Sequence, residues 1–253
     1  MPNTQIILVR HGQSTYNAQK RYQGSCDRSD LTEIGDREAI LAGQMLANRM
    51  GTQTVDVVYS SPLKRALQTA QTLVNQLDLP SLLPIAQDDL REIDLPGWAG
   101  LPFQQVQTEF PEAYRCWQEQ PQNFQMTVAT KSLSSTVPIA VMEPQSITTF
   151  PVRDLYQRAQ HFWRNLLHDH KGERILTVSH GGTIRALVST ALGIMPDKFH
   201  YLQQSNCGIT TLEFDEWGQA SLLDMNVETH TGKTLPKLKN GKQGIRLLLV
   251  PTD

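Results

Sequence analysis

The sequence predicts an α/β fold: a three-layer sandwich in which a mostly parallel central sheet is covered by helices on both faces. Three apolar runs predict the sheet, and two of them lead directly into a helical pattern. The runs are Ile6–Val9, Val55–Ser60 and Arg174–Ser179. Strands that alternate with helices are typical of parallel sheets, because each parallel connection needs a crossover. We expect one domain over residues 1–253, with a cap or flap inserted at about residues 95–150.

The first strand ends on Arg10, His11 and Gly12. Ligands of open α/β sheets bind beyond the carboxyl ends of the strands. An arginine and a histidine there are suited to holding an anion and attacking it, and a glycine lets the backbone approach a ligand closely. A histidine taken alone is as often a structural residue. The later strand repeats the arrangement, however, since it delivers His180 and Gly181 at its own end.

The segment after the second strand predicts a helix that begins beside an anion. Ser61 is a typical N-cap residue, and Pro62 is typical of a first helical turn. Arg65 then lies in the first turn, where a cation opposes the helix dipole unless an anion is nearby. An isolated arginine would be a solvated surface residue, but the two histidine-bearing strand ends favour phosphate binding here.

Further elements complete the predicted sandwich. Apolar stripes predict helices over residues 35–50 and 152–170, and another helix follows His180. Later strands are expected at Ile209–Phe214, Leu222–Met225 and Ile245–Val250.

Two regions break the alternation of strands and helices. Residues 95–126 combine prolines with aromatic residues and predict a partly helical cap over the sheet's edge. Residues 127–150 are rich in Ser, Thr and Val and carry little charge. Long segments of this kind are usually lids or mobile loops, so a hairpin flap and disorder both remain open.

Six short motifs appear in order along most of the chain. They read Arg10-His11-Gly12-x-Ser14-x-x-Asn17, Gln23-Gly24, Leu31-Thr32-x-x-Gly35, Ser60-Ser61-Pro62-Leu63-x-Arg65-Ala66-x-x-Thr69-Ala70, Leu90-Arg91-Glu92-Ile93-Asp94 and Ser179-His180-Gly181-Gly182. Together they resemble the histidine phosphatase superfamily, which includes the cofactor-dependent phosphoglycerate mutases and many phosphomonoesterases.

A narrower resemblance comes from the segments 92–101, 110–118, 151–156 and 204–208. They are similar to a plant and cyanobacterial group labelled 2-carboxy-D-arabinitol-1-phosphate phosphatases. This resemblance implies a substrate among the sugar phosphates that inhibit Rubisco. One site can host many phosphoesters, so phosphoserine, phosphoglycerate and a broad range of phosphomonoesters stay open as alternatives.

The resemblance implies that His11 is the nucleophile and forms a phosphohistidine that water then hydrolyses. Its second ring nitrogen would be fixed by a hydrogen bond to the backbone. Charge on the phosphoryl group would be neutralised by Arg10, Arg65 and an imidazolium at His180, since two arginines and one imidazolium can hold a dianion without metal. We therefore expect no metal and no cofactor.

Glu92 follows a predicted strand that ends near the apolar Leu90. It is the expected general acid, which must carry a proton when the alcohol leaves. Asp94 is its nearest competitor, and pairing of Glu92 with Arg91 at the surface is the alternative without catalysis. The expected substrate-binding residues are Ser14, Asn17, Gln23, Gly24, Gly181, Asn206 and Arg153. Asn206 would support His11 or the phosphate-site arginines.

A second anionic group of the substrate has three candidate contacts: Arg115, Lys131 and Arg153. For any one of them a solvated charge is the simpler interpretation. Arg153 stands where many superfamily members carry Gly-Glu-Ser, so a cation replaces a carboxylate near the expected mouth of the pocket. A mutase would need several extra cations after the acid, and Arg115 is the only Arg or Lys between Glu92 and Lys131. Hydrolysis is therefore favoured over mutase activity, and a non-catalytic binding protein is the alternative from a different class.

Composition sets the remaining expectations. The net charge of −2 and a pI of about 6.4 exclude a globally basic nucleic-acid binder. Three scattered cysteines suggest neither a disulfide framework nor a zinc site. No apolar run approaches the roughly 18 residues of a membrane span. Because a strand begins by Gln5, we expect no targeting segment. Together with the few cysteines, this predicts a cytoplasmic protein. The expected partner is a small phosphorylated molecule, and the oligomeric state stays open.

Overall fold

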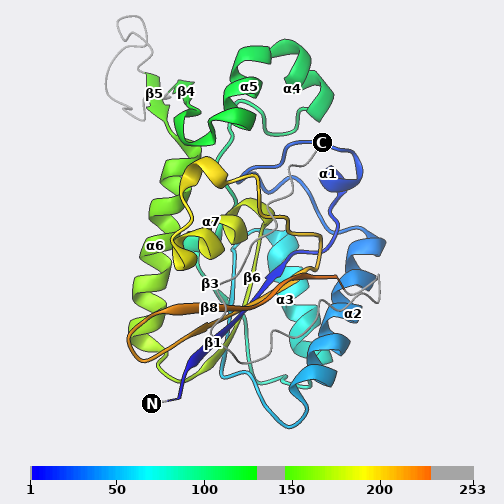
Figure 1. Cartoon of the computed structure of the whole chain (residues 1–253). Helices are drawn as coiled ribbons and strands as arrows, with labels where there is room; N and C mark the ends of the chain where they lie inside the picture. Colours follow the sequence, from blue (N-terminus) through cyan, green and yellow to red (C-terminus); the bar gives the residue numbers. More distant parts are fainter. Residues whose placement is uncertain (1, 130–145, 229–253) are drawn as a thin grey trace, which may run out of the picture.

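The computed structural model describes residues 2–129 and 146–228, and Figure 1 shows an α/β sandwich. Its six-stranded sheet has the order β3-β2-β6-β1-β7-β8. These strands are β1 (Thr4–Arg10), β2 (Val57–Ser60), β3 (Ile85–Ala86), β6 (Arg174–Ser179), β7 (Ile209–Phe214) and β8 (Ala220–Val227). The strands from β3 to β1 are parallel to one another, whereas β7 and β8 pair antiparallel. The predicted fold class, with its mostly parallel sheet, is confirmed.

Helices cover the sheet on both faces (Figure 1). The helices are α1 (Thr15–Ala18), α2 (Glu33–Met50), α3 (Lys64–Gln76), α4 (Phe103–Glu109), α5 (Pro111–Glu119), α6 (Pro151–Asp169) and α7 (Gly181–Leu192). Side chains of β1 alternate between the two faces. Ile6 and Leu8 belong to the core formed with α6 and α7, while Ile7 and Val9 belong to the core formed with α2 and α3. The central strand is therefore buried on both sides, which explains its continuous apolar run.

Helix α3 begins later than the sequence predicts. Its N-cap is Leu63, which makes no side-chain capping bond, and its first helical residue is Lys64. Ser61 still belongs to the edge of the sheet, because its N–H donates to the carbonyl of Val178 over 2.9 Å. The predicted Ser61 cap is therefore wrong. The Ser61 hydroxyl bonds His180 over 2.7 Å and accepts from the N–H of Leu63, the actual N-cap, over 3.3 Å.

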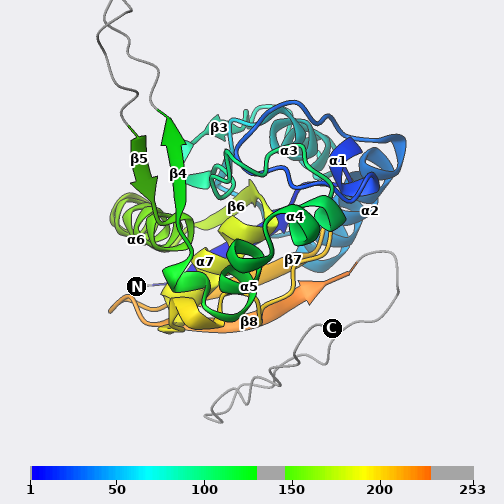
Figure 2. The same cartoon turned by 90° about the horizontal axis from the view of Figure 1, so that it is seen from above.

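The segment from residue 95 to 126 is partly helical, as predicted, and carries α4, α5 and a short 3₁₀ turn, Pro121–Asn123. Seen from above in Figure 2, α4 and α5 lie over the strands of the sheet. Trp98, Trp117 and Phe124 anchor this cap through ring contacts of 4.8–6.0 Å between centroids. The cap therefore covers the carboxyl ends of the strands, where the predicted site lies.

The two ends of the predicted flap pair with each other as a small antiparallel sheet. Strand β4 (Met126–Ala129) runs against β5 (Ser146–Thr149). The residues between them, with Lys131, lie outside the described residues, and so does the predicted strand Ile245–Val250. Within the described ranges, no helix is both long and apolar enough to cross a membrane.

Candidate active site

The two histidine-bearing strand ends lie side by side. Strands β1 and β6 are hydrogen-bonded neighbours, with Arg10 in register with Ser179, so His11 and His180 leave the sheet at the same edge. Their ring centroids are 5.1 Å apart, with an angle of 62° between the rings. The structure thus brings together the two histidines that the sequence pattern places at one edge.

His11 is held in one orientation by its own loop. Its Nδ1 lies 2.7 Å from the carbonyl oxygen of Gly12. A carbonyl only accepts, so Nδ1 carries the proton and Nε2 is left with a free electron pair. Burial lowers the pKa of His11 well below its usual value, and the nearby Arg65 and Arg10 lower it further. The ring is therefore neutral at pH 7, with Nε2 able to act as a nucleophile.

His180 is fully buried behind His11. Its Nε2 bonds the hydroxyl of Ser61, and its Nδ1 is buried without a hydrogen-bond partner in the described part of the chain. Burial and then Arg65 lower the pKa of His180 well below its usual value. The expected imidazolium is therefore not supported: the ring is neutral and offers polar atoms rather than a full charge.

Arg10 and Arg65 are positioned by main-chain oxygens. Arg10 donates to the carbonyl of Gln204 over 2.7 Å, and Arg65 donates to those of Cys26 and Gly24 over 2.9 and 3.0 Å. Across the described residues, neither arginine forms an ion pair with a carboxylate. Carbonyls orient these cations without neutralising them. Glu92 favours their charged forms at longer range, but the cavity lining has four arginines to this one carboxylate, so the site keeps a net positive charge that an anion would satisfy.

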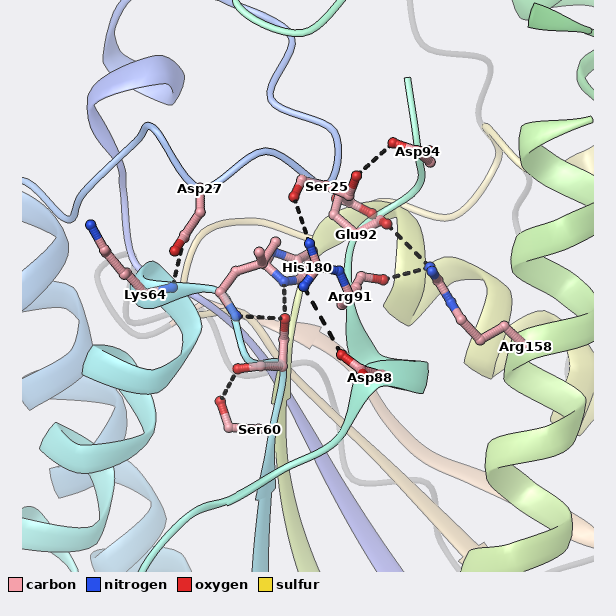
Figure 3. A network of polar contacts seen from close by, with 12 residues as sticks. Ser25, Asp27, Ser60, Lys64, Asp88, Arg91, Glu92, Asp94, Arg158 and His180 are labelled. Carbon is pink, nitrogen blue, oxygen red and sulfur yellow. Dashed lines mark hydrogen bonds and ion pairs between the residues drawn. The ribbon is translucent and has the colours of Figure 1, made fainter. Parts of the chain in front are cut away.

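The carboxylate of Glu92 lies at the start of α7. It accepts hydrogen bonds of 3.1 Å from the N–H groups of Gly182 and Thr183, and one of 3.3 Å from the Thr183 hydroxyl. Glu92 follows a short 3₁₀ turn, Asp88–Leu90, where the sequence predicts a strand. Asp94 is exposed and bonds the hydroxyl of Ser25, so it does not compete for the position of Glu92 (Figure 3).

The Glu92 segment is held by a residue that the sequence analysis missed. Arg158 of α6 donates to the carbonyls of Arg91 and Glu92 over 2.6 and 3.1 Å, as Figure 3 shows. A lone arginine on a helix with an apolar stripe gave no motif signal. Because Arg158 and Glu92 are far apart in the sequence, no local pattern indicates that they are in contact.

His11, Arg10, Arg65 and Glu92 line a cavity of about 190 Å³, whereas the fully buried His180 packs next to His11 and does not line it. Among the predicted residues that line it are Arg10, His11, Asn17, Gln23, Gly24, Arg65, Glu92 and Gly181. The wall on the cap side is apolar and aromatic and includes Tyr22, Ile93, Leu95, Phe103, Trp117 and Phe199. The cavity is smaller than the pockets of ~300–1,000 Å³ that hold drug-sized ligands, so it suits a compact molecule.

Two predicted binding residues stand behind the cavity wall. Ser14 is fully buried, and its hydroxyl lies 2.9 Å from the side-chain oxygens of both Asn17 and Gln23. Asn206 donates to the carbonyl of His11 over 3.0 Å and to the side-chain oxygen of Asn17 over 3.2 Å. Ser14 and Asn206 therefore position the residues that line the cavity, and direct binding by either is not supported.

The predicted contacts for a second anionic group are also displaced. Arg153 donates to the carbonyl of Gln122 over 2.6 Å and to the side-chain oxygen of Asn123 over 3.0 Å, so it ties α6 to the cap. It does not line the cavity, so the structure gives no support to its assignment to substrate binding. Arg115 is exposed on α5 and does not line the cavity either.

Gly12 serves packing more than ligand approach. A Cβ atom at Gly12 would collide with the carbonyl oxygen of Gly35 at the start of α2, and one at Gly35 would collide with that of Gln13. Gly12 is absent from the cavity lining. The expected close approach to a ligand is therefore replaced by a close approach of two backbones, which explains both glycines of the sequence motifs.

Two further arginines of the lining escaped the sequence analysis. Arg21 donates to the carbonyl of Gly100 over 2.7 Å, and Arg185 follows Gly181 by one turn of α7. The signal for Arg185 was available, because it is a cation between the buried residues Ile184 and Ala186. No group of three or more His, Cys, Asp or Glu side chains that could hold a metal ion is found within residues 2–129 and 146–228.

A family model described as the histidine phosphatase superfamily (branch 1) matches residues 6–137 and 141–227. The chain belongs to the histidine phosphatase superfamily. The sequence motifs from Arg10 to Gly182 fall inside the matched ranges, which also include the described six-stranded sheet except Thr4 and Gln5 of β1.

The curated relatives of this chain carry more than one substrate name. It is 36% identical over 209 residues to a probable 2-carboxy-D-arabinitol-1-phosphatase of Arabidopsis thaliana, covering 83% of this chain and 38% of that protein. It is 29% identical to phosphoserine phosphatase 1 of Hydrogenobacter thermophilus, covering 90% and 94%. The chain thus spans little more than a third of the length of the plant relative.

The fold is shared with solved structures. A mycobacterial glucosyl-3-phosphoglycerate phosphatase superposes with a TM-score of 0.69 at 24% identity, over 88% of this chain and 98% of that one. At this identity the likeness establishes the shared fold.

Proposed function

We propose that this chain is a phosphomonoesterase that works through a phosphohistidine at His11. The observation that carries the proposal is a neutral imidazole between two guanidinium groups that have no carboxylate partner in the described residues. Such a site attracts a phosphate dianion and presents it to the free electron pair of Nε2.

In the first step, Nε2 of His11 attacks phosphorus, and the bond from phosphorus to the ester oxygen breaks. Glu92 gives its proton to the leaving oxygen, which departs as an alcohol. In the second step, water attacks phosphorus and passes a proton to Glu92, and the bond from phosphorus to Nε2 breaks. Arg10 and Arg65 hold the phosphoryl oxygens throughout, while the neutral, buried His180 packs against His11 from the side of Ser61. This scheme needs no metal and no cofactor.

The substrate that we propose is 2-carboxy-D-arabinitol 1-phosphate or a related small pentose phosphate. The support is the identity of 36% to the plant relative and a compact cavity with polar and cationic walls. Phosphoserine is the second candidate, because the bacterial phosphoserine phosphatase matches over 94% of its own length. Mutase activity and binding without turnover are the remaining alternatives.

The test is phosphate release from a panel of sugar phosphates, phosphoserine and phosphoglycerates, ranked by kcat/KM. We expect the 2-carboxypentitol phosphate to rank first, and His11→Ala to abolish release from every substrate. A His11→Ala variant that still releases phosphate would exclude the mechanism. Phosphoserine in first place would leave the mechanism intact and replace the substrate.

A further inference from the structure

Arg185 has surroundings that differ from those of the other arginines of the cavity. Arg10, Arg65 and Arg21 each donate to one or two main-chain carbonyls. Arg185 makes no hydrogen bond or ion pair with any described residue, and its Nε atom is buried without a partner. Its residual exposure is to the cavity that it lines.

The charge of Arg185 has no ion-pair partner among the described residues, and only the more distant carboxylate of Glu92 favours it. Its guanidinium lies 5.8 Å from the centre of the Phe199 ring, which is a weak partner for a cation. Burial, followed by the charge of Arg10, lowers the pKa of Arg185 to about 10, so the group still carries its charge at pH 7. A cation held in this way is costly unless an anion joins it, and the open side of Arg185 faces the cavity.

The position of Arg185 sets where that anion would lie. Gly181 and Arg185 are one turn apart on the same face of α7, a rise of about 6 Å. Gly181 packs beside Arg10, since a Cβ atom there would lie 3.5 Å from Nε of Arg10. Arg185 therefore stands one helical turn from the phosphate centre, toward Phe199 and Trp117 of the cap side.

We propose that Arg185 binds a second anionic group, a carboxylate or a phosphate, carried by the leaving alcohol of the substrate. The inference rests on the proposed function and deepens it. It names the substrate class as compact phosphomonoesters with two anionic groups a few bonds apart. It also replaces Arg153, which was one of the three sequence candidates for this role and which the structure places against the cap.

The test compares substrates that differ only in the second anionic group. The pairs are 3-phosphoglycerate with glycerol 3-phosphate, and ribulose 1,5-bisphosphate with ribulose 5-phosphate. Wild type prefers the more anionic member of at least one pair. In Arg185→Met, which keeps the length of the side chain, the ratio of the two kcat/KM values falls about tenfold or more, or ~1.4 kcal/mol. The pair that responds tells whether the second group is a carboxylate or a phosphate.

The matched control is Arg164→Met, which removes an exposed arginine from α6 and leaves both ratios at the wild-type value. An Arg185→Met variant with unchanged ratios in both pairs would overturn the inference. Arg185→Lys is the second variant, because it keeps the charge if Arg185→Met does not fold, and it retains part of the preference.

Calorimetry separates this inference from the proposed function. In the His11→Ala background, the affinities for 3-phosphoglycerate and glycerol 3-phosphate, and for the two ribulose phosphates, are measured with and without Arg185→Met. A preference that disappears with Arg185 supports the second anionic site even if the chain hydrolyses none of these esters. Equal affinities within both pairs would refute the site even if hydrolysis is observed.

Discussion

The floor of the cavity and its cap side hold their arginines by different means. On the floor, Arg10 and Arg65 are anchored by carbonyls of loops that follow the sheet. On the cap side, the hydrogen bonds of Arg153 join α6 to the cap, and Arg185 has no hydrogen-bond or ion-pair partner among the described residues. If both proposals hold, the anchored arginines of the floor fix the phosphate, whereas the unpartnered arginine of the cap side selects what the phosphate is attached to.

The floor should be the more sensitive of the two regions to loss of a guanidinium. Arg65→Lys keeps a charge but loses the planar fork that bonds Cys26 and Gly24. We expect kcat/KM to fall about hundredfold for every phosphomonoester, measured by phosphate release. The control is Arg153→Lys on the cap side, which should stay within about twofold of wild type. Equal losses in the two variants would remove the distinction between floor and cap side.

The attachment of the cap should weaken in acid. Burial, with the charge of Arg185, lowers the pKa of His200 to about 4, although its hydrogen bond of 2.7 Å to the carbonyl of Trp117 opposes the shift. The unfolded chain takes up this proton first, near pH 6.5, so the free energy of unfolding falls as the pH drops from 6.5 toward 4. The loss from His200 is about 2 kcal/mol between pH 8 and pH 5.

Denaturant titrations at pH 8 and pH 5 measure this loss in wild type and in His200→Gln. The glutamine can still donate to the Trp117 carbonyl but does not titrate, so the variant should lose less stability at pH 5. An identical loss in both proteins would assign the pH dependence to other groups, His11 and His180 among them.

A substitution at the start of α7, where backbone N–H groups bond Glu92, should displace the Glu92 carboxylate. A Cβ atom at Gly182 would lie 2.5 Å from Oε1 of Glu92, so Gly182→Ala must push the carboxylate away from the start of α7. We expect kcat to fall about tenfold for alkyl phosphates, which need a proton on the leaving oxygen, and much less for 4-nitrophenyl phosphate.

Gly97→Ala is the control for this variant, because a Cβ atom at Gly97 meets only Met126 at 3.9 Å. Its kinetics should match wild type with both classes of ester. A Gly182→Ala variant that slows both classes equally would argue against an acid role for Glu92.

The smallest effect is expected at Arg153. Arg153→Glu breaks the bonds to Gln122 and Asn123, so it should lower the free energy of unfolding by less than about 1 kcal/mol. The ratio of KM for 3-phosphoglycerate to KM for 4-nitrophenyl phosphate should change less than twofold. A larger, selective rise in KM for the carboxylated ester would return Arg153 to the substrate.

The sequence predicted the residues on the floor of the cavity well and those on its cap side poorly, because different interactions fix the two sets of side chains. Strand ends are fixed by backbone pairing, so β1 and β6 bring His11 and His180 together once both runs are identified as parallel neighbours. Whether a side chain of α6 or α7 reaches the cavity depends instead on how these helices pack against the sheet and the cap. The sequence analysis therefore assigned a place at the cavity to Arg153 and none to Arg185, whereas the structure ties Arg153 to the cap and lines the cavity with Arg185.

The same contrast explains two local errors on the floor. Ser61 has the residue type of a helix cap, but a backbone bond to Val178 keeps it in the sheet and turns its hydroxyl to His180. Burial of His180 decides its charge, and the number of arginines around it is visible only in three dimensions. The residue types predicted that these side chains would lie near one another. Their burial in the folded chain sets whether the histidine is charged.

The most direct test of the account is to trap the phosphorylated protein. The chain is mixed with a ³²P-labelled substrate, quenched in alkali within milliseconds, and digested for mass spectrometry. The account predicts label on the peptide that contains His11, stable in alkali and lost in acid, and no label in His11→Ala. Label on the peptide of His180, or turnover with no trapped label in wild type at any time, would contradict it.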